Sequence, residues 1–228
     1  MPLRGCMQSG ACRGGGRRGT GKIAPEQVPA SIEESTGITM REIALHLMDI
    51  AENSVAAESR NIRMDVVEDL HTDLLQVCVA DDGRGMDVET AKRVLDPFYT
   101  TRTTRKVGLG IPLLKLAAES TEGGLSLETE SGKGTRVEAS FRHGHIDRMP
   151  LGDIGTTFLT LLVSYPHIHW VFMYQLKDKQ GNLKEFVFDD EEIKSALGDV
   201  SLTEPDVLRF LRGMIEEGIA ALAPQTEF

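Results

Sequence analysis

The stretch "VADDGRGMD", residues 79–87, follows a short apolar run and decides how the rest of the chain is interpreted. It places two carboxylates directly after a predicted strand and then two glycines that are separated by Arg84. A simple turn needs one glycine or two adjacent ones. Glycines at alternate positions indicate a backbone that lets another group come close. The stretch therefore predicts a loop that something approaches closely.

The composition indicates a globular chain of one large or two small domains. It has 228 residues, of which 40% are hydrophobic, and no apolar run approaches the roughly 18 residues of a membrane span. The first residues lack the apolar core of a secretory signal. Cys6, Cys12 and Cys78 are too few and too scattered for a disulfide framework or a zinc site. These features predict a cytoplasmic protein that does not span a membrane.

The charge is distributed unevenly. Residues 1–22 carry five basic residues and no acidic one. Because the net charge of the whole chain is −10, the remaining residues together carry a net charge of −15. An acidic body argues against a nucleic-acid partner. Residues 1–36 are predicted to be a disordered, basic head rich in Gly and Arg. A start at Met40 is plausible, so the sequence leaves open whether residues 1–39 belong to the native protein.

The periodicity from Met40 onward predicts an α+β fold. Apolar residues recur at helical spacing in "REIALHLMDIAENSVAAES", and four later segments alternate with period two. We expect a two-layer α/β sandwich in which helices cover one face of a mixed, mostly antiparallel sheet. Residues 150–228 are predicted to add a small α/β unit, an accessory helix–hairpin–helix. The histidines His145, His167 and His169 share metal-ligand spacing with no cysteine and no second carboxylate, and they are interpreted as structural.

Four motifs occur in a characteristic order: "DIAENS", "DDGRGMD", "VGLGIPLLK" and "SGKGTRVEASF". Together they resemble the GHKL superfamily of ATP-binding domains, named for gyrase, the heat-shock chaperone, histidine kinases and mismatch-repair ATPases. The resemblance covers about residues 40–143, combines features of the histidine-kinase and mismatch-repair types, and predicts a histidine-kinase-like ATP-binding domain at residues 37–145. It implies the Bergerat fold and the ligands ATP and Mg²⁺.

The resemblance assigns the adenine contact to the loop quoted at the start. Asp81 is expected to accept a hydrogen bond from the adenine amino group, which suits an acceptor-only carboxylate. Gly83 and Gly85 would let the backbone close over the base. Thr135 matches the threonine that supports this contact, and a threonine that merely begins a strand is the alternative. Asp82 is interpreted as a solvated turn residue.

The resemblance assigns the binding of Mg²⁺ and of the ATP phosphates to two other motifs. Asn53 matches the magnesium-binding asparagine, and its amide oxygen is a hard, neutral ligand of the kind that Mg²⁺ accepts. Gly108 and Gly110, just before a predicted helix, would offer backbone amides to the phosphates. Asp49, one helical turn before Asn53, occupies the position of the general base. Glu52 has the residue type usual for that base but points about 100° away from Asn53.

Three hypotheses describe what the protein does with bound ATP. The leading one is a phosphotransferase that acts on a separate protein partner, because residues 1–39 do not fit the hairpin that carries the phosphoacceptor histidine of sensor kinases. His46 is expected to orient a neighbour or to meet solvent. The alternatives are a slowly hydrolysing conformational switch like the mismatch-repair ATPases and a non-catalytic ATP sensor. A homodimer is compatible with the sequence, which does not specify the oligomeric state.

Overall fold

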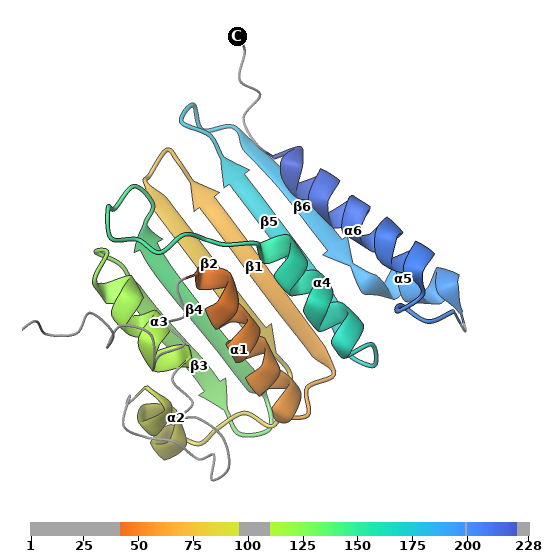
Figure 1. Ribbon diagram of the computed structural model, residues 1–228. Helices are drawn as coiled ribbons and strands as arrows, with labels where there is room; N and C mark the ends of the chain where they lie inside the picture. Colours follow the sequence, from red (N-terminus) through yellow and green to blue (C-terminus); the bar gives the residue numbers. More distant parts are fainter. Residues whose placement is uncertain (1–41, 96–109, 199, 223–228) are drawn as a thin grey trace, which may run out of the picture. The chain divides into compact units, whose positions relative to one another are not determined.

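The computed structural model describes residues 42–95, 110–198 and 200–222, which belong to one compact unit, Thr39–Phe228 (Figure 1). Among the helices defined in these residues, none combines the length and the apolar character needed to cross a membrane. In chain order the elements are α1 (Ile43–Ala56), β1 (Asn61–Asp69), β2 (Leu74–Asp81), α2 (Val88–Val94), α3 (Gly110–Glu119), β3 (Gly124–Glu130), β4 (Gly134–Arg142), α4 (Ile154–Ser164), β5 (His169–Lys177), β6 (Leu183–Asp189), α5 (Asp190–Leu197) and α6 (Pro205–Ala220).

The first helix forms where apolar residues recur at helical spacing. Ile43, Leu47 and Ile50 of α1 are almost fully buried. Burying each such aliphatic side chain contributes about 1.5–3 kcal/mol, so this stripe decides which side of the helix packs on the sheet. Asp49 and Asn53 lie half-buried at the margin of the stripe.

The strands form one mixed sheet in the order β3-β4-β2-β1-β5-β6. Its pairs are antiparallel except for β1 and β5, which run parallel with Asn61 opposite His169. The predicted mixed, mostly antiparallel sheet is therefore confirmed. In β2 and β4 the register places Asp81 opposite Thr135, so the strand ends bring two candidate residues together.

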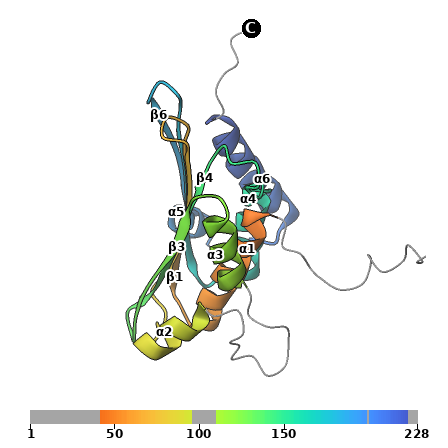
Figure 2. The same cartoon turned by 90° about the vertical axis from the view of Figure 1, so that its left-hand side faces the viewer.

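The helices cover one face of the sheet, as Figure 2 shows for α1, α3, α4 and α6. The alternation of β1 explains this arrangement, because Ile62, Met64 and Val66 are buried against the helices while Arg63 is exposed on the other face. Asp65 also lies on that outer face, where the guanidinium of Arg63 pairs with it at 2.7 Å. The two-layer sandwich expected from the sequence is thus confirmed.

The C-terminal strands continue the same sheet. β5 pairs with β1, and Phe158 of α4 packs on Phe172 and Phe188 with ring centroids 4.9 and 5.5 Å apart. Aromatic pairs of this kind contribute about 0.5–1.5 kcal/mol beyond the area that they bury. The helix and hairpin expected after residue 150 are present, and α5 adds a further helix before α6. The strands β1 and β5, which lie on either side of residue 150 in the chain, are directly paired in one sheet. The domain boundary expected near residue 150 stays a prediction.

Candidate functional site

Three neighbouring groups hold the carboxylate of Asp81, the last residue of β2. The Ser54 hydroxyl donates to Oδ2 at 2.6 Å. The Ser59 hydroxyl and the Gly83 backbone N–H donate to Oδ1 at 3.1 and 2.9 Å. A carboxylate accepts only and has about four lone-pair sites. The half-buried side chain is therefore oriented by the protein and keeps acceptor capacity for an N–H group of a ligand.

The paired glycines are required by close contacts within the protein. A Cβ on Gly83 would lie 2.5 Å from the Ser59 hydroxyl oxygen, and one on Gly85 would lie 2.0 Å from the Glu130 carbonyl oxygen. Gly85 also has a φ of +60°, which side chains other than glycine rarely adopt. At both glycines the group that comes close is another part of the same chain: Ser59 at Gly83 and Glu130 at Gly85. Whether adenine also approaches these glycines stays a prediction.

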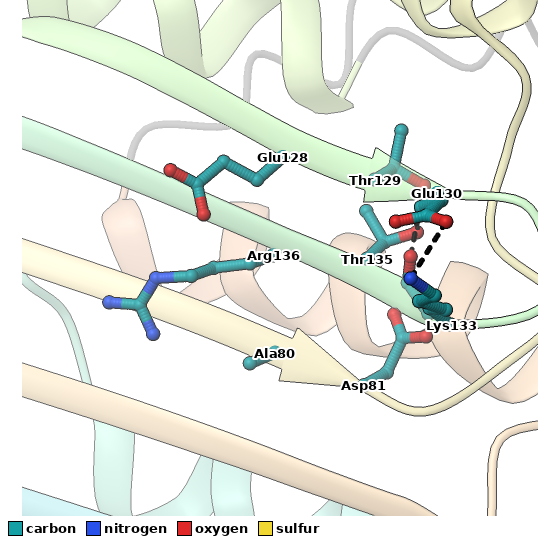
Figure 3. A pocket seen from close by; sticks show the side chains of 9 residues that line it. Ala80, Asp81, Glu128, Thr129, Glu130, Lys133, Thr135 and Arg136 are labelled. Carbon is teal, nitrogen blue, oxygen red and sulfur yellow. Dashed lines mark hydrogen bonds and ion pairs between the residues drawn. The ribbon is translucent and has the colours of Figure 1, made fainter.

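A cavity of about 340 Å³ borders Asp81 and Thr135 (Figure 3). The Thr135 hydroxyl lies 3.1 Å from that of Thr129, whose oxygen also accepts from the Met86 N–H at 2.9 Å. The Thr135 hydroxyl thus belongs to a polar group beside Asp81, and both its role in the adenine contact and the alternative of a threonine that merely begins a strand stay predictions. The volume lies within the range of about 300–1,000 Å³ that is typical of small-molecule sites.

The polar margin of α1 meets the first residue of α3. Oδ2 of Asp49 lies so close to Gly110 that a Cβ on this glycine would come within 1.9 Å of it. Nδ1 of His46 lies 3.2 Å from the Gly110 carbonyl oxygen, and His46 is only 1% exposed. The expectation that His46 orients a neighbour agrees with this contact, whereas exposure to solvent is wrong. Gly108 lies outside the described residues.

The side chain of Asn53 lies one turn after Asp49 on α1. Asn53 and Asp49 are half-buried, whereas Glu52 is exposed, as the helix phase predicted. The amide oxygen of Asn53 is a hard oxygen donor, the class that Mg²⁺ prefers. The residues present at this end of the site therefore fit a magnesium ion that completes its coordination with water and phosphate oxygens.

Asp82 is exposed but is not simply solvated. Its Oδ1 accepts from the backbone N–H groups of Arg60 and Asn61 at 2.7 and 2.9 Å, and its Oδ2 accepts from the Asn61 amide at 2.5 Å. Desolvation raises its pKa, but the hydrogen bonds from Asn61 and Arg60 outweigh this effect and hold the pKa below its ordinary value. Asp82 is thus exposed, as expected, and in addition it ties the loop after β2 to the start of β1.

Comparison with known proteins assigns this part of the chain to a family. Residues 37–145 match the family described as histidine kinase-, DNA gyrase B- and HSP90-like ATPase. These residues form a GHKL domain. The GHKL domain contains α1, the loop after Asp81, Gly110 and Thr135, so the strand ends and helix margin described above lie within an ATP-binding domain of the histidine-kinase type.

Individual relatives of the GHKL domain are sensor proteins and kinases. The chain is 37% identical over 59 residues to Sporulation kinase C of Bacillus subtilis. This matched segment is 26% of this chain and 14% of the relative. It is 36% identical over 89 residues to Sensor protein kinase FleS of Pseudomonas aeruginosa, or 39% of this chain and 22% of the relative. It is 26% identical over 103 residues to a Putative sensor protein of Shewanella frigidimarina, and the matched segment is 45% of this chain and 15% of the relative. The chain thus spans less than a quarter of the length of these relatives.

The residues that hold Asp81 escaped the sequence-based prediction. Ser54 lies in the apolar stripe of α1 and is only 4% exposed, while Ser59 is 5% exposed in the turn that follows. A hydroxyl at a buried position of a helix needs a partner, and that was the available signal. The partner, Asp81, lies 27 residues further along the chain from Ser54, so only the folded structure identifies it. The functional roles of the predicted site residues remain predictions.

Proposed function

We propose that the chain is an Mg²⁺- and ATP-dependent phosphotransferase that acts on a separate protein partner in the cytoplasm. The GHKL domain and the kinases among its relatives support the kinase-type chemistry. The observation on which the proposal depends is the position of the Asp49 carboxylate against Gly110, at the start of α3. An acidic side chain at this point lies beside the glycine motif that is proposed to hold the phosphates.

The proposed roles follow from the donors and acceptors at each end of the site. Asp81 would accept from the adenine amino group, and Thr135 would support that contact beside Gly83 and Gly85. Gly108 and Gly110 would offer backbone amides to the phosphates. A bound Mg²⁺ would neutralise phosphate charge, and Asn53 would hold it through its amide oxygen.

Asp49 is the proposed general base. It would take the proton from the attacking group of the partner while the new bond to the γ-phosphorus forms and the bond to the β–γ bridging oxygen breaks, so that ADP leaves. The exposed Glu52 cannot take this role without rotating the helix, because it lies about 100° from Asn53 around α1. A base near the nucleophile contributes about 10²–10⁴-fold to the rate.

Labelled ATP distinguishes this proposal from its two alternatives. The full chain is incubated with [γ-³²P]ATP and Mg²⁺, alone and with protein fractions from the organism that encodes it. Label on another protein, lost in the Asp49→Asn variant and on chelation of Mg²⁺, supports the phosphotransferase. Free phosphate without labelled protein would instead indicate an ATP-driven switch. ATP binding without label or free phosphate would indicate a sensor.

A further inference from the structure

His169, at the start of β5 and outside the GHKL domain, has a defined tautomer. Its Nδ1 lies 3.0 Å from Oδ1 of Asn61, the residue opposite it in the parallel pair of β1 and β5. The amide orientation of Asn61 is determined by its other contact, because its Nδ2 donates to the acceptor-only carboxylate of Asp82 at 2.5 Å. Asn61 therefore presents its oxygen to His169, and Nδ1 carries a proton.

The other ring nitrogen of His169 faces a second acceptor. Nε2 lies 2.9 Å from Oδ1 of Asp189, the last residue of β6. With the proton on Nδ1, a neutral imidazole offers only a lone pair at Nε2. A lone pair and a carboxylate oxygen at this distance repel each other unless a positive charge lies between them. That charge is either a second proton or a metal ion.

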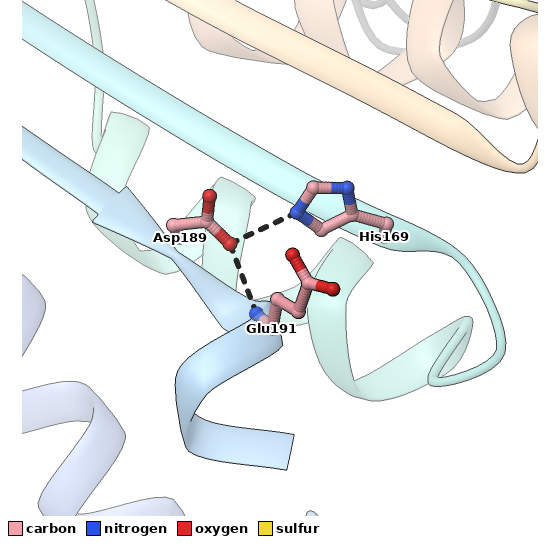
Figure 4. Close-up of side chains that lie close together, drawn as sticks. All are labelled: His169, Asp189 and Glu191. Atoms are coloured by element: carbon pink, nitrogen blue, oxygen red, sulfur yellow. Dashed lines mark hydrogen bonds and ion pairs between the residues drawn. The ribbon is translucent and has the colours of Figure 1, made fainter. Parts of the chain in front are cut away.

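Two more carboxylates lie beside this pair. The ligand atoms of His169, Asp189 and Glu191 all lie within 4.8 Å of one another, and Figure 4 shows the three side chains converging. Oδ1 of Asp190 lies 3.9 Å from His169 Nε2; it is buried, and within the described residues it accepts no hydrogen bond of normal geometry. Lys194 pairs with the other oxygen of Asp190 at 2.5 Å. The Lys194 ammonium therefore offsets the charge of the buried Asp190 carboxylate, and the candidate ligands are His169, Asp189 and Glu191.

We propose that His169, Asp189 and Glu191 bind a divalent transition-metal ion such as Zn²⁺. One imidazole nitrogen and two carboxylate oxygens suit such an ion, with metal–ligand distances of about 2.0–2.2 Å and water in the remaining positions. Asn61 supplies the support that metal-binding histidines usually have, an oxygen that accepts from the second ring N–H. His169 is half-buried and Glu191 is exposed, so an ion reaches the site from solvent.

This proposal revises the interpretation of His169 as a purely structural histidine. The spacing along the chain could not reveal the site, because His169 and Asp189 are separated by 20 residues and meet only through the pairing of β5 and β6. The cluster is also joined to the nucleotide site, since the Asn61 that supports His169 is held by the residue next to Asp81.

Calorimetry with Zn²⁺ tests the site on the full chain in the absence of nucleotide. The parent carries Cys6→Ser and Cys12→Ser, so that these thiols cannot bind the ion. We expect one Zn²⁺ per chain at the site and at least about a tenfold loss of affinity in His169→Gln and in Glu191→Gln. His167→Gln, which alters an exposed histidine two residues away, is the matched control and should bind like the parent. Co²⁺ should give visible absorption bands that His169→Gln lacks.

Either of two calorimetric results would overturn the proposal. One is that the parent binds no Zn²⁺, and the other is that His169→Gln and Glu191→Gln bind it as tightly as the parent. Nitrogen NMR of the His169 ring provides an independent measurement. A metal leaves a proton on Nδ1 alone and shifts Nε2, whereas protons on both nitrogens, unchanged by Zn²⁺, would mean that an imidazolium pairs with Asp189 instead.

Discussion

The Ser54 hydroxyl donates a 2.6 Å hydrogen bond to Oδ2 of Asp81 and thereby joins the first helix to the end of the second strand. Asn53, the proposed magnesium ligand, is the neighbour of Ser54 in the chain. The same segment of α1 therefore orients the proposed adenine acceptor and carries the proposed metal ligand. Movement of α1 against the sheet would disturb both ends of the proposed nucleotide site.

Asp81→Asn should weaken ATP binding. Asn can present a donor to the donor of adenine, and loss of a hydrogen bond to a charged group costs about 1.5–3 kcal/mol, or roughly 10- to 150-fold in affinity. Calorimetry measures this loss. Asp82→Asn is the matched control, since it changes a carboxylate one residue away that contacts Arg60 and Asn61. It should lower stability by about 1 kcal/mol or less and leave ATP affinity near that of the parent. Unchanged ATP affinity in Asp81→Asn would contradict the proposed adenine contact.

Ser54→Ala should also weaken ATP binding, by a smaller factor. It removes one of the three donors that orient Asp81, and a hydrogen bond contributes about 0.5–1.5 kcal/mol, or roughly 2- to 12-fold. Ser120→Ala is the control, because its hydroxyl bonds to the Ala117 carbonyl oxygen at the end of α3 instead. If both variants bind ATP equally well, orientation of Asp81 by Ser54 does not matter for binding.

The helix phase of α1 predicts different effects at three neighbouring positions. Asp49→Asn should lower turnover by about 10²–10⁴-fold with nearly unchanged ATP affinity, as expected for a base. Asn53→Ala should lower both, because a magnesium ligand also contributes to nucleotide binding. Glu52→Gln, on the exposed side, should change little. Steady-state kinetics together with calorimetry separates these effects. The reverse ranking, with Glu52→Gln inactive and Asp49→Asn active, would assign the base to Glu52.

Gly110→Ala should displace Asp49. The new Cβ would lie 1.9 Å from Asp49 Oδ2, so we expect a loss of about 1–3 kcal/mol in stability and a loss of turnover. Adding Asp49→Ala removes the clash and should restore stability but not turnover. Gly213→Ala in α6 meets nothing within 4 Å and should raise stability by up to about 1 kcal/mol. Thermal unfolding measures all three. A fully stable Gly110→Ala would show that the two residues are not in contact.

Cys78 should make stability depend on alkaline pH. Burial raises the pKa of its thiol from 9.0 to about 12. Above pH 9 the thiol of the unfolded chain loses its proton while that of the folded chain keeps it, so this contribution is complete below pH 9 and is lost as the pH rises toward 12. Denaturant unfolding should show this decline in the parent and a smaller one in Cys78→Ala. Equal declines would show that other groups cause it.

Much of the fold could be predicted because its signals are local. The alternation of Ile62, Met64 and Val66 defines a strand with one buried face, and the stripe of Ile43, Leu47 and Ile50 defines a helix that packs on it. The alternation specifies a face of the strand but not its neighbour. The parallel pairing of β1 with β5 therefore could not be predicted, because the choice of partner depends on packing summed over the whole sheet.

The sequence alone determined the α+β fold, the mostly antiparallel sheet and the order of motifs that marks the GHKL domain. It also determined the phase of α1, in which Asp49 and Asn53 share one side and Glu52 does not, because side chains four residues apart lie on the same face of a helix. Only the tertiary structure determined which other groups contact these residues. The two serine donors to Asp81, the contact of Asp49 with Gly110 and the contacts from Asp82 through Asn61 to His169 join residues that are 21 to 108 positions apart. Contacts at such separations arise only when several elements pack at once, and no local pattern encodes their distances.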